Sequence, residues 1–574
     1  MEKVRLTIDG KEIVVEPGST ILAAAEQLGI KVPSLCHHPE LRPAGACRVC
    51  MVEVEGARTL VASCVYPVSE GLVVHTNTAD VREARRTVVE LLLANHPSDC
   101  LSCYKNQKCE LQKIAADLNI RQIPFRGEKN EYPLDTSNPS LIREPSKCIK
   151  CGRCVRVCSE RQDVNVYSFV NRGFKTIVAP AFELGLGDVA CTLCGQCATV
   201  CPTAAIIEKD DTPGVWHSLS DKTKHVVVQT APSVRVALGE ALGLPTASIA
   251  TGKMVAALRR LGFAKVFDTD FGADLTIMEE GHELLHRIKQ GGVLPMITSC
   301  SPGWVNFIEQ NYSDLLSHLS TAKSPMQMFG AIVKTYYAQK TGTDPKDIIS
   351  VAIMPCTAKK AEALRPDMAS SGYQDVDWVL TTRELARMIT EAGIDFATLP
   401  EEEFDDPLGD STGAAVIFGA SGGVMEAALR TVADVLAQES LPDLEYKAVR
   451  GLEGIKEAIV KVKDLEIRVA VAHSLANARV LLEKIRQGEA KYHFIEVMAC
   501  PGGCIGGGGQ PYPVSKEVRE ARIAAIYDCD EAMVLRKSHE NPRIKELYEE
   551  FLGEPLGDKA HHLLHTHYKA QQKG

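Results

Sequence analysis

Two closely spaced cysteine runs constrain this chain more than any other feature. CIKCGRCVRVC covers residues 148–158 and CTLCGQCATVC covers residues 191–201, and each has the spacing C-x2-C-x2-C-x3-C. Thiolates at this spacing hold paired 4Fe–4S clusters, in which the fourth cysteine of each run serves the other cluster. The pattern therefore predicts two such clusters. Their ligands are Cys148, Cys151, Cys154 and Cys201 for one and Cys191, Cys194, Cys197 and Cys158 for the other.

The totals exclude several classes of protein. The chain has 574 residues and a net charge of -10, with acidic and basic residues mixed along it. A nucleic-acid surface needs a basic stripe instead. No run reaches the roughly 18 apolar residues of a spanning helix, and the charged, alternating start MEKVRLTIDGKEIVV is unlike an export signal. We therefore expect a cytoplasmic protein with no nucleic-acid or membrane partner, whose twenty cysteines do not form disulfides.

The first 79 residues predict a small strand-rich domain with its own cluster. VRLTID and KEIVVE alternate around a glycine turn, and TILAAAEQLGI follows with helical spacing. This order, followed by a cysteine loop, resembles the β-grasp of plant-type 2Fe–2S ferredoxins. Four thiolates satisfy a 2Fe–2S cluster, although CxxC with two outlying cysteines also suits zinc. The candidate ligands are Cys36, Cys47, Cys50 and Cys64.

A histidine joins the second cysteine group. The segment 81–95 predicts an amphipathic helix, and His96 stands at its end, four residues before a CxxC pair. An imidazole that replaces a thiolate removes a negative charge and raises the potential of a cluster. The group predicts a 4Fe–4S cluster, with a zinc site of the Cys3His type as the alternative. Its candidate ligands are His96, Cys100, Cys103 and Cys109.

After residue 210 the pattern changes to alternating strands and helices, which is typical of parallel α/β sheets. HVVVQTAPSVRVALGEAL, VAIMPCTAKKAEAL, GAAVIFGASGGVMEAALRTVADVLA and RVAVAHSLANARVLLEKI each predict a strand, a turn and a helix. The glycine-rich stretch 419–424 lacks the GxGxxG spacing of a dinucleotide site. A nicotinamide partner would therefore bind to another subunit. Cys529 stands alone and is interpreted as an ordinary thiol.

Three further cysteine loops follow predicted strands, where sites form in open α/β sheets. They are ITSCSPGW, MPCTAKKAE and MACPGGCIGGGGQP. Together they resemble the signature motifs of FeFe hydrogenases, and the preceding 210 residues match the accessory domains of the longer members. The resemblance implies an H-cluster, which is a 4Fe–4S cubane joined through a cysteine to a two-iron unit that carries CO, cyanide and azadithiolate.

The resemblance also implies roles for individual residues. Cys356, Cys500 and Cys504 would hold the cubane, with Cys504 bridging to the two-iron unit, and Lys359 would contact a cyanide. The two-iron pocket would be lined by Pro232, Ser233, Pro325, Met354, Phe418 and Met498. A proton path would use Glu280, Glu283, Arg287 and Ser320. From the helical pattern alone, the two glutamates would instead lie on a solvated face.

One position departs from the family. Its first signature usually reads Thr-Ser-Cys-Cys-Pro-x-Trp, where the first cysteine delivers protons and the second holds the cubane. Here these positions are Cys300 and Ser301. A hydroxyl binds iron–sulfur clusters less well than a thiolate does, so ligand softness favours Cys300 as the fourth ligand, with Ser301 or water in the proton path. The sequence leaves both assignments open.

The predicted fold is multidomain, α+β and α/β. We expect a β-grasp 2Fe–2S domain at 1–79, a His/Cys 4Fe–4S domain at 80–140, a two-cluster ferredoxin domain at 141–210 and a two-lobed catalytic domain at 211–574. In total this implies one 2Fe–2S cluster, three accessory 4Fe–4S clusters and the H-cluster.

The resemblance implies reversible H2 oxidation and proton reduction. Ferredoxin, or flavin- and NAD(P)-binding partner subunits, would exchange the electrons. Two alternatives are an iron–sulfur relay subunit of an NADH dehydrogenase and a non-catalytic relative that acts in sensing or cluster assembly. The first alternative leaves Cys356, Cys500 and Cys504 without a role, and Ser301 is the best support for the second.

Overall fold

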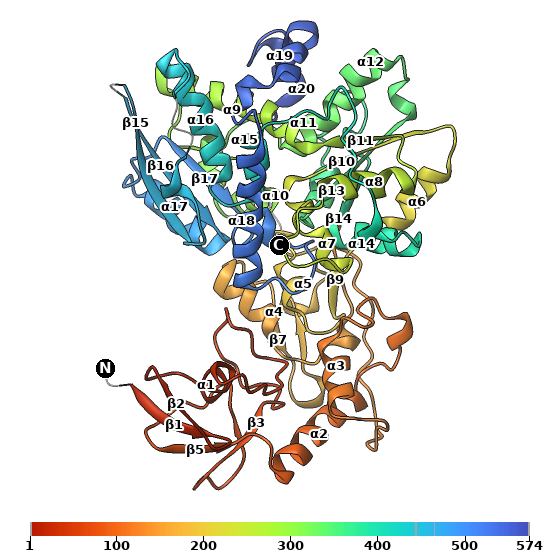
Figure 1. Cartoon of the computed structure of the whole chain (residues 1–574), viewed down its shortest axis with the longest axis vertical. Helices are drawn as coiled ribbons and strands as arrows, with labels where there is room; N and C mark the ends of the chain where they lie inside the picture. The colour runs from red at the N-terminus through yellow and green to blue at the C-terminus, as the bar shows by residue number, and fades with distance from the viewer. Residues whose placement is uncertain (1–2, 442–444, 464, 572–574) are drawn as a thin grey trace. The chain divides into compact units, whose positions relative to one another are not determined.

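The computed structural model describes residues 3–441, 445–463 and 465–571. The chain forms two compact units. The N-terminal unit contains Met1–Arg161, Asn165–Val189 and Val200–Ile207, and the C-terminal unit contains Gln162–Val164, Ala190–Thr199 and Glu208–Gly574. In Figure 1 the first is drawn mainly in red and orange and the second mainly in yellow-green to blue. Each unit is described by itself.

The N-terminal unit begins with a five-stranded sheet of order β2-β1-β5-β3-β4. Its strands are β1 (Val4–Ile8), β2 (Lys11–Val15), β3 (Met51–Val54), β4 (Val61–Ala62) and β5 (Leu72–His75). The predicted hairpin is β1 and β2, which pair antiparallel with Leu6 opposite Ile13. β1 pairs parallel with β5. The predicted helix is α1 (Ile21–Gln27), and the Thr20 hydroxyl caps its N-terminus.

The rest of the N-terminal unit has short elements. They are α2 (Ala79–Ala94), α3 (Glu110–Asp117), β6 (Leu141–Arg143), α4 (Arg153–Arg156), β7 (Ser168–Val170) and β8 (Ile177–Ala179). The predicted amphipathic helix is α2, with Val81 and Val89 buried. β7 and β8 form an antiparallel hairpin. Two more elements, α5 (Gln196–Val200) and β9 (Ile206–Glu208), contain residues of both units.

The C-terminal unit contains two four-stranded sheets. The first is parallel throughout, in the order β11-β10-β13-β14. Its strands are β10 (His225–Thr230), β11 (Lys265–Asp268), β13 (Ile348–Met354) and β14 (Trp378–Thr381). They are buried almost throughout, because helices cover a parallel sheet on both faces.

The second sheet has the order β12-β17-β16-β15. Its strands are β12 (Met296–Ile297), β15 (Ile455–Val462), β16 (Leu465–His473) and β17 (Phe494–Met498). β12, β17 and β16 are parallel, and β15 is an antiparallel edge strand. Alternate residues of β15 are exposed, as an edge strand with one solvated face requires.

Helices connect and cover these two sheets. They are α6 (Thr212–Ser220), α7 (Leu238–Ala241), α8 (Thr251–Leu261), α9 (Thr269–Gln290), α10 (Pro302–Asn311), α11 (Pro325–Ile332), α12 (Ala338–Thr341), α13 (Ala358–Ala363), α14 (Thr382–Glu391), α15 (Gly413–Val416), α16 (Gly423–Ala437), α17 (Leu475–Arg486), α18 (Lys516–Ala532), α19 (Pro542–Leu547) and α20 (Asp558–Leu564). Figure 1 labels most of them. Within the described residues, none is long and apolar enough to cross a membrane.

One predicted strand is wrong. GAAVIF was expected to be a strand before a turn and a helix, but it forms α15 and a short 3-10 turn, Ile417–Gly419. The prediction failed because a short apolar run has the same composition in a buried helix as in a buried strand. Ala414 through Phe418 are all buried in the core that also includes α16.

Candidate functional site

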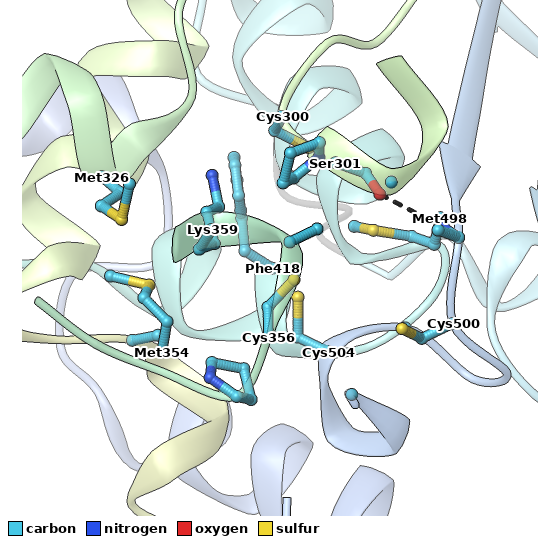
Figure 2. Close-up of a pocket in the computed structure, with 18 of the residues that line it drawn as sticks. Cys300, Ser301, Met326, Met354, Cys356, Lys359, Phe418, Met498, Cys500 and Cys504 are labelled. Atoms are coloured by element: carbon cyan, nitrogen blue, oxygen red, sulfur yellow. Dashed lines mark hydrogen bonds between the residues drawn. The ribbon is translucent and has the colours of Figure 1, made fainter. Parts of the chain in front are cut away.

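The three cysteine loops meet in one buried cavity of the C-terminal unit (Figure 2). Cys300 follows β12, Cys356 follows β13 and Cys500 follows β17, so all three lie beyond the carboxyl ends of parallel strands. Ala231 and Pro232, directly after β10, line the same cavity. Both sheets of the unit therefore contribute to one site, as expected for open α/β sheets.

Three cysteines and one serine are among the residues that line this cavity: Cys356, Cys500, Cys504 and Ser301. In Figure 2 the sulfurs of Cys356 and Cys504 lie close together, with Cys500 to one side. The Ser301 hydroxyl oxygen accepts a hydrogen bond from the backbone N–H of Ala499 at 3.2 Å. Because Ala499 immediately precedes Cys500, this bond holds the serine hydroxyl beside the loop that carries two of the cysteines.

Burial controls the acidity of these thiols. It raises the pKa of Cys504 to about 12, and nearby Cys356 adds to the effect while Lys359 opposes it. The pKa of Cys500 is raised well above its ordinary value, first by burial and then by Cys356 and Cys194. A thiol with a raised pKa keeps its proton unless a metal replaces it. Metal binding at these thiols would therefore have to release their protons.

Cys300 has different surroundings. Its pKa is raised well above the ordinary value, first by burial and then by the carboxyl group of Glu280, while Lys359 opposes the shift. Cys300 also packs against the apolar core that includes Ala273 and Ile277 of α9. It therefore lies between the cavity and the helix that carries the two predicted proton-path glutamates.

Glycines let the loop that carries Cys500 and Cys504 pack closely against neighbouring backbone. A Cβ atom on Gly503 would lie 2.6 Å from the backbone nitrogen of Ser421, and one on Gly507 would lie 2.1 Å from the carbonyl oxygen of Pro355. Gly503 also has φ +93°, which side chains rarely adopt. The glycine run therefore lets this loop pack directly against the backbone of the neighbouring loops at Ser421 and Pro355.

Most of the predicted pocket residues line the cavity. They are Pro232, Pro325, Met354, Lys359, Phe418 and Met498. Lys359 Nζ is 2.7 Å from Glu362 Oε2. Ser233 is not among the lining residues; its backbone oxygen and hydroxyl each lie 3.3 Å from Gln510 Nε2. Sequence reasoning missed Met326, whose position at the start of α11, directly after Pro325, was the available signal.

The second ferredoxin-type run reaches the same cavity. Cys194 is one of its lining residues. The Thr357 hydroxyl donates to the carbonyl of Leu193 at 2.8 Å, and Gln196 Nε2 donates to the carbonyl of Gly506 at 3.0 Å. A Cβ on Gly508 would lie 2.4 Å from the carbonyl oxygen of Cys194. Residues 190–199 are thus bound directly to the loops that follow β13 and β17.

The predicted proton-path residues form a continuous buried group. Glu280 and Glu283 are 1% and 8% exposed, so the solvated-face alternative is wrong. Burial raises the pKa of Glu280 to about 8, and Ser320, which bonds to it, lowers it in part. The Ser320 hydroxyl also lies 3.2 Å from Glu283 Oε2. Arg287 pairs with Glu283 at 2.6 Å.

The four cysteines of the first group are buried together beside the β-grasp sheet, in the same apolar core. Hydrogen bonds from Cys47 and Cys64 lower the pKa of Cys36. Cys50 is also bonded to Cys64, which lowers its pKa to about 6. The structure thus brings together Cys36, Cys47, Cys50 and Cys64.

The second group encloses a cavity after α2. Its lining includes His96, Cys100, Cys103 and Cys109. His96 Nδ1 lies 2.8 Å from the carbonyl of Pro97, which fixes the proton on that nitrogen. The other nitrogen, Nε2, is buried and has no hydrogen-bond partner among the described residues. A buried nitrogen without a hydrogen-bond partner, in a residue that lines one cavity with three cysteines, is suited to a metal ligand.

The structure brings together only one of the two remaining cysteine sets. Cys148, Cys151, Cys154 and Cys201 line one cavity of the N-terminal unit. Burial raises the pKa of Cys148 to about 11. The other set is divided: Cys158 is in the N-terminal unit, and Cys191, Cys194 and Cys197 are in the C-terminal unit. This set stays a prediction. Among the described residues, no three His, Cys, Asp or Glu side chains are arranged to bind a single metal ion.

Comparison with family models assigns most of the chain. Residues 224–508 match the iron only hydrogenase large subunit, C-terminal domain, and 516–571 match the iron hydrogenase small subunit. Residues 1–79 match a 2Fe-2S iron-sulfur cluster binding domain, 85–124 the NADH-ubiquinone oxidoreductase-G iron-sulfur binding region, and 147–205 a 4Fe-4S dicluster domain.

Two relatives are similar to this chain over nearly its whole length, and a solved structure is similar over part of it. The NADP-reducing hydrogenase subunit HndD of Solidesulfovibrio fructosivorans is 53% identical, with 100% of both chains covered. Iron hydrogenase 1 of Clostridium pasteurianum is 42% identical, with 98% of this chain and 99% of the relative covered. A solved variant of the [FeFe]-hydrogenase HydA1 from Chlamydomonas reinhardtii is 47% identical. It covers 63% of this chain and 99% of its own, with a TM-score of 0.57.

Proposed function

Because this chain belongs to the iron-only hydrogenase family, we propose that it interconverts H2 with two protons and two electrons at an H-cluster in the cavity of Figure 2. One observation carries the proposal. Cys356, Cys500 and Cys504 enter a single buried cavity from loops that follow β13 and β17. When bound, the H-cluster would supply the iron that takes up and releases H2 and stores electrons.

The side chains around the cavity supply protons and exclude water. Glu280, with its raised pKa, is able to hold a proton near neutral pH and pass it towards Cys300. Ser320 connects Glu280 to Glu283, which lies nearer to solvent. Met326, Met354 and Phe418 form an apolar lining that keeps bulk water from the reacting centre. Lys359 places a positive charge in the same lining, where it suits an anionic ligand.

In this proposal Ser301 is the fourth ligand of the cubane, although the softness of a thiolate ligand favoured Cys300 in the sequence analysis. The Ser301 hydroxyl is bonded beside Cys500, whereas Cys300 lies towards Glu280. Cys300 would then pass protons to the two-iron unit. Ser301 would hold the cubane through its hydroxyl oxygen, and three thiolates with one hydroxyl are a weaker ligand set than four thiolates.

Electrons would reach the cavity through the cluster that includes Cys194. The residues around Cys194 are bonded to the loops of Cys356 and Cys504, so the two clusters would be neighbours. The further sets at Cys36, His96 and Cys148 would extend the route. We propose one 2Fe–2S and three accessory 4Fe–4S clusters, with His96 Nε2 as a ligand of one of them.

The electron partner is proposed from the relative that matches over the full length. The name of HndD describes that protein as a subunit of an NADP-reducing hydrogenase. We propose that this chain likewise works with flavin- and NAD(P)-binding partner subunits in the cytoplasm, with ferredoxin as a second electron carrier. Affinity purification from the native source, followed by subunit and flavin analysis, tests this. A chain that purifies alone and reacts with ferredoxin only would contradict it.

Infrared spectroscopy of the matured protein tests the catalytic proposal. We expect CO and cyanide stretches in the native chain and their loss in Cys504→Ala, with Cys529→Ala as a matched control. Cys529 is a free thiol on α18 outside the cavity. An electron-relay subunit would have no such bands, and a non-catalytic relative would show bands without H2 turnover.

A further inference from the structure

A chain of hydrogen bonds leaves the proposed proton route at Glu283. Thr321 Oγ1 lies 3.0 Å from Glu283 Oε2 and 2.8 Å from His565 Nδ1. On the other side of the imidazole, His565 Nε2 lies 2.9 Å from Glu279 Oε2. The side chains of His565 and Glu279 are both 0% exposed. The function proposed above gives no role to Thr321, His565 or Glu279.

The backbone holds this group in place. The C-terminal segment after α20 pairs with the loop before α11, with Ala322 opposite His565. Thr566 N–H donates to the carbonyl of Thr321, and Lys323 N–H donates to the carbonyl of Leu564, both at 2.8 Å. His565 is therefore placed opposite the Thr321 hydroxyl by main-chain pairing.

Glu279 fixes one proton of the imidazole. Its Oε1 accepts from the Tyr548 hydroxyl, and its Oε2 accepts from the backbone N–H of Leu556 at 2.9 Å. Two donors already point at this carboxylate, which is an acceptor when ionised. His565 Nε2 consequently carries a hydrogen that it donates to Glu279, in the manner of a carboxylate that orients a histidine.

Thr321 has one hydroxyl proton and two possible acceptors. When His565 is neutral, its Nδ1 lone pair accepts the hydroxyl proton, and nothing is donated to Glu283 through Oγ1. When His565 is an imidazolium, Nδ1–H donates to Oγ1, and the hydroxyl proton turns to Glu283 Oε2. The direction of this one O–H bond therefore depends on the charge of His565.

We propose that His565 is a positioning residue for proton delivery, which exchanges a proton with Glu283 through the Thr321 hydroxyl. In the forward step, the Thr321 O–H bond breaks as Glu283 Oε2 gains the proton. Oγ1 takes a replacement from Nδ1, and His565 becomes neutral. The reverse step restores the imidazolium, so no other reactant is needed. The proposal rests on the function proposed above.

Charged groups on several elements face this imidazole. Glu279 and Glu283 belong to α9, Tyr548 to the π-helical turn Tyr548–Leu552, and Arg287 pairs with Glu283. The ring of exposed His561 stacks on His565 at 4.9 Å with an interplanar angle of 5°, and the ring centroid of His567 lies 6.3 Å from that of His561.

Turnover as a function of pH tests the proposal in matured full-length protein. Thr321→Val removes the hydroxyl at nearly constant volume, Thr321→Ser keeps it, and His565→Gln removes the titrating group. We expect a roughly tenfold loss of H2 evolution in Thr321→Val, less than the 10²- to 10⁴-fold effect of a sole general acid, because Glu283 keeps its own route. Thr321→Ser should restore the native pH profile.

The pH profile separates proton exchange from a structural role. The native protein should lose activity in two steps as pH rises, and Thr321→Val and His565→Gln should each lack one step. Native profiles in both variants would overturn the proposal. So would a uniform loss at every pH that Thr321→Ser does not rescue. If His565→Gln does not fold, the two Thr321 variants decide alone.

A measurement without turnover distinguishes this proposal from the proposed function. Neutron diffraction of deuterium-exchanged protein at a mildly acidic and at an alkaline pH locates the deuterons, which X-ray data at ordinary resolution do not show. We expect deuterons on both nitrogens of His565 and an O–D of Thr321 towards Glu283 at the lower pH, and an O–D towards His565 at the higher. An unchanged O–D direction would overturn the proposal even in an active enzyme.

Discussion

The Ser301 hydroxyl accepts a hydrogen bond from the backbone N–H of Ala499, the residue immediately before Cys500. This bond holds the serine beside the cysteine loop after β17, while the carboxyl group of Glu280 helps to raise the pKa of the neighbouring Cys300. Two adjacent residues of one turn thus have different surroundings. The contrast carries the assignment of Ser301 to the cubane and of Cys300 to proton transfer.

Substitutions at these two positions test the assignment. Cys300→Ala should keep an intact H-cluster and lose roughly 10²- to 10⁴-fold in turnover, because a proton donor is missing. Ser301→Cys should shift the EPR signal and lower the cubane potential, since a thiolate adds negative charge. Infrared and EPR spectra of identically matured variants provide the measurement. Loss of the cluster in Cys300→Ala, with a native spectrum in Ser301→Cys, would show that Cys300 is the ligand.

His96→Cys should lower the potential of its cluster while keeping the cluster. A charged thiolate would replace the neutral imidazole, which lines one cavity with Cys100, Cys103 and Cys109. A redox titration followed by EPR should show a change on the order of 100 mV. His75→Cys, at an exposed ion pair with Glu55 in the same unit, is the control. Equal potentials in native protein and His96→Cys would mean that His96 is not a ligand.

Gly508→Ala should impair electron entry more than chemistry at the active site. Its Cβ would lie 2.4 Å from the carbonyl oxygen of Cys194, so the run that holds the neighbouring cluster must move. H2/D2O exchange requires no external electrons, whereas turnover with a protein electron donor does. We expect donor-linked turnover to fall more than exchange. The control is Gly127→Ala, where a Cβ meets nothing within 4 Å. Parallel losses of both activities would contradict the role of this contact.

Glu280 should set an upper pH limit for H2 evolution. Burial raises its pKa to about 8, above the ordinary value of 4.5, so the residue loses its proton only as pH rises through that value. Proton delivery should therefore decline above about pH 8. Glu280→Gln should remove this step and reduce turnover roughly 10²- to 10⁴-fold. An unchanged pH profile in Glu280→Gln would exclude the residue from the proton route.

The groups of cysteine ligands could be predicted from the sequence because metal ligands need fixed local spacing. The structure brings together three of the four predicted accessory sets, at Cys36, His96 and Cys148. The predicted family and fold class are confirmed by full-length similarity to iron-only hydrogenases. The domain boundaries and the ligand sets stay predictions.

Contacts between residues that are far apart in the chain could not be predicted from the sequence. Thr321 and His565 are separated by 244 residues, and no local pattern marks either one. Ser233 was expected in the pocket wall from the family resemblance, but its hydroxyl and backbone oxygen lie near Gln510 instead. The choice between Cys300 and Ser301 also depends on a contact with Ala499, which belongs to a different strand connection.

Hydrogen evolution from reduced methyl viologen tests the central claim most directly. The full-length protein is matured with a synthetic two-iron complex and compared with Cys504→Ala and with Cys529→Ala under the same treatment. The account predicts sustained H2 evolution by the native chain and Cys529→Ala, and none by Cys504→Ala. A native chain that holds its accessory clusters but evolves no H2, or a Cys504→Ala variant as active as the native chain, would contradict it.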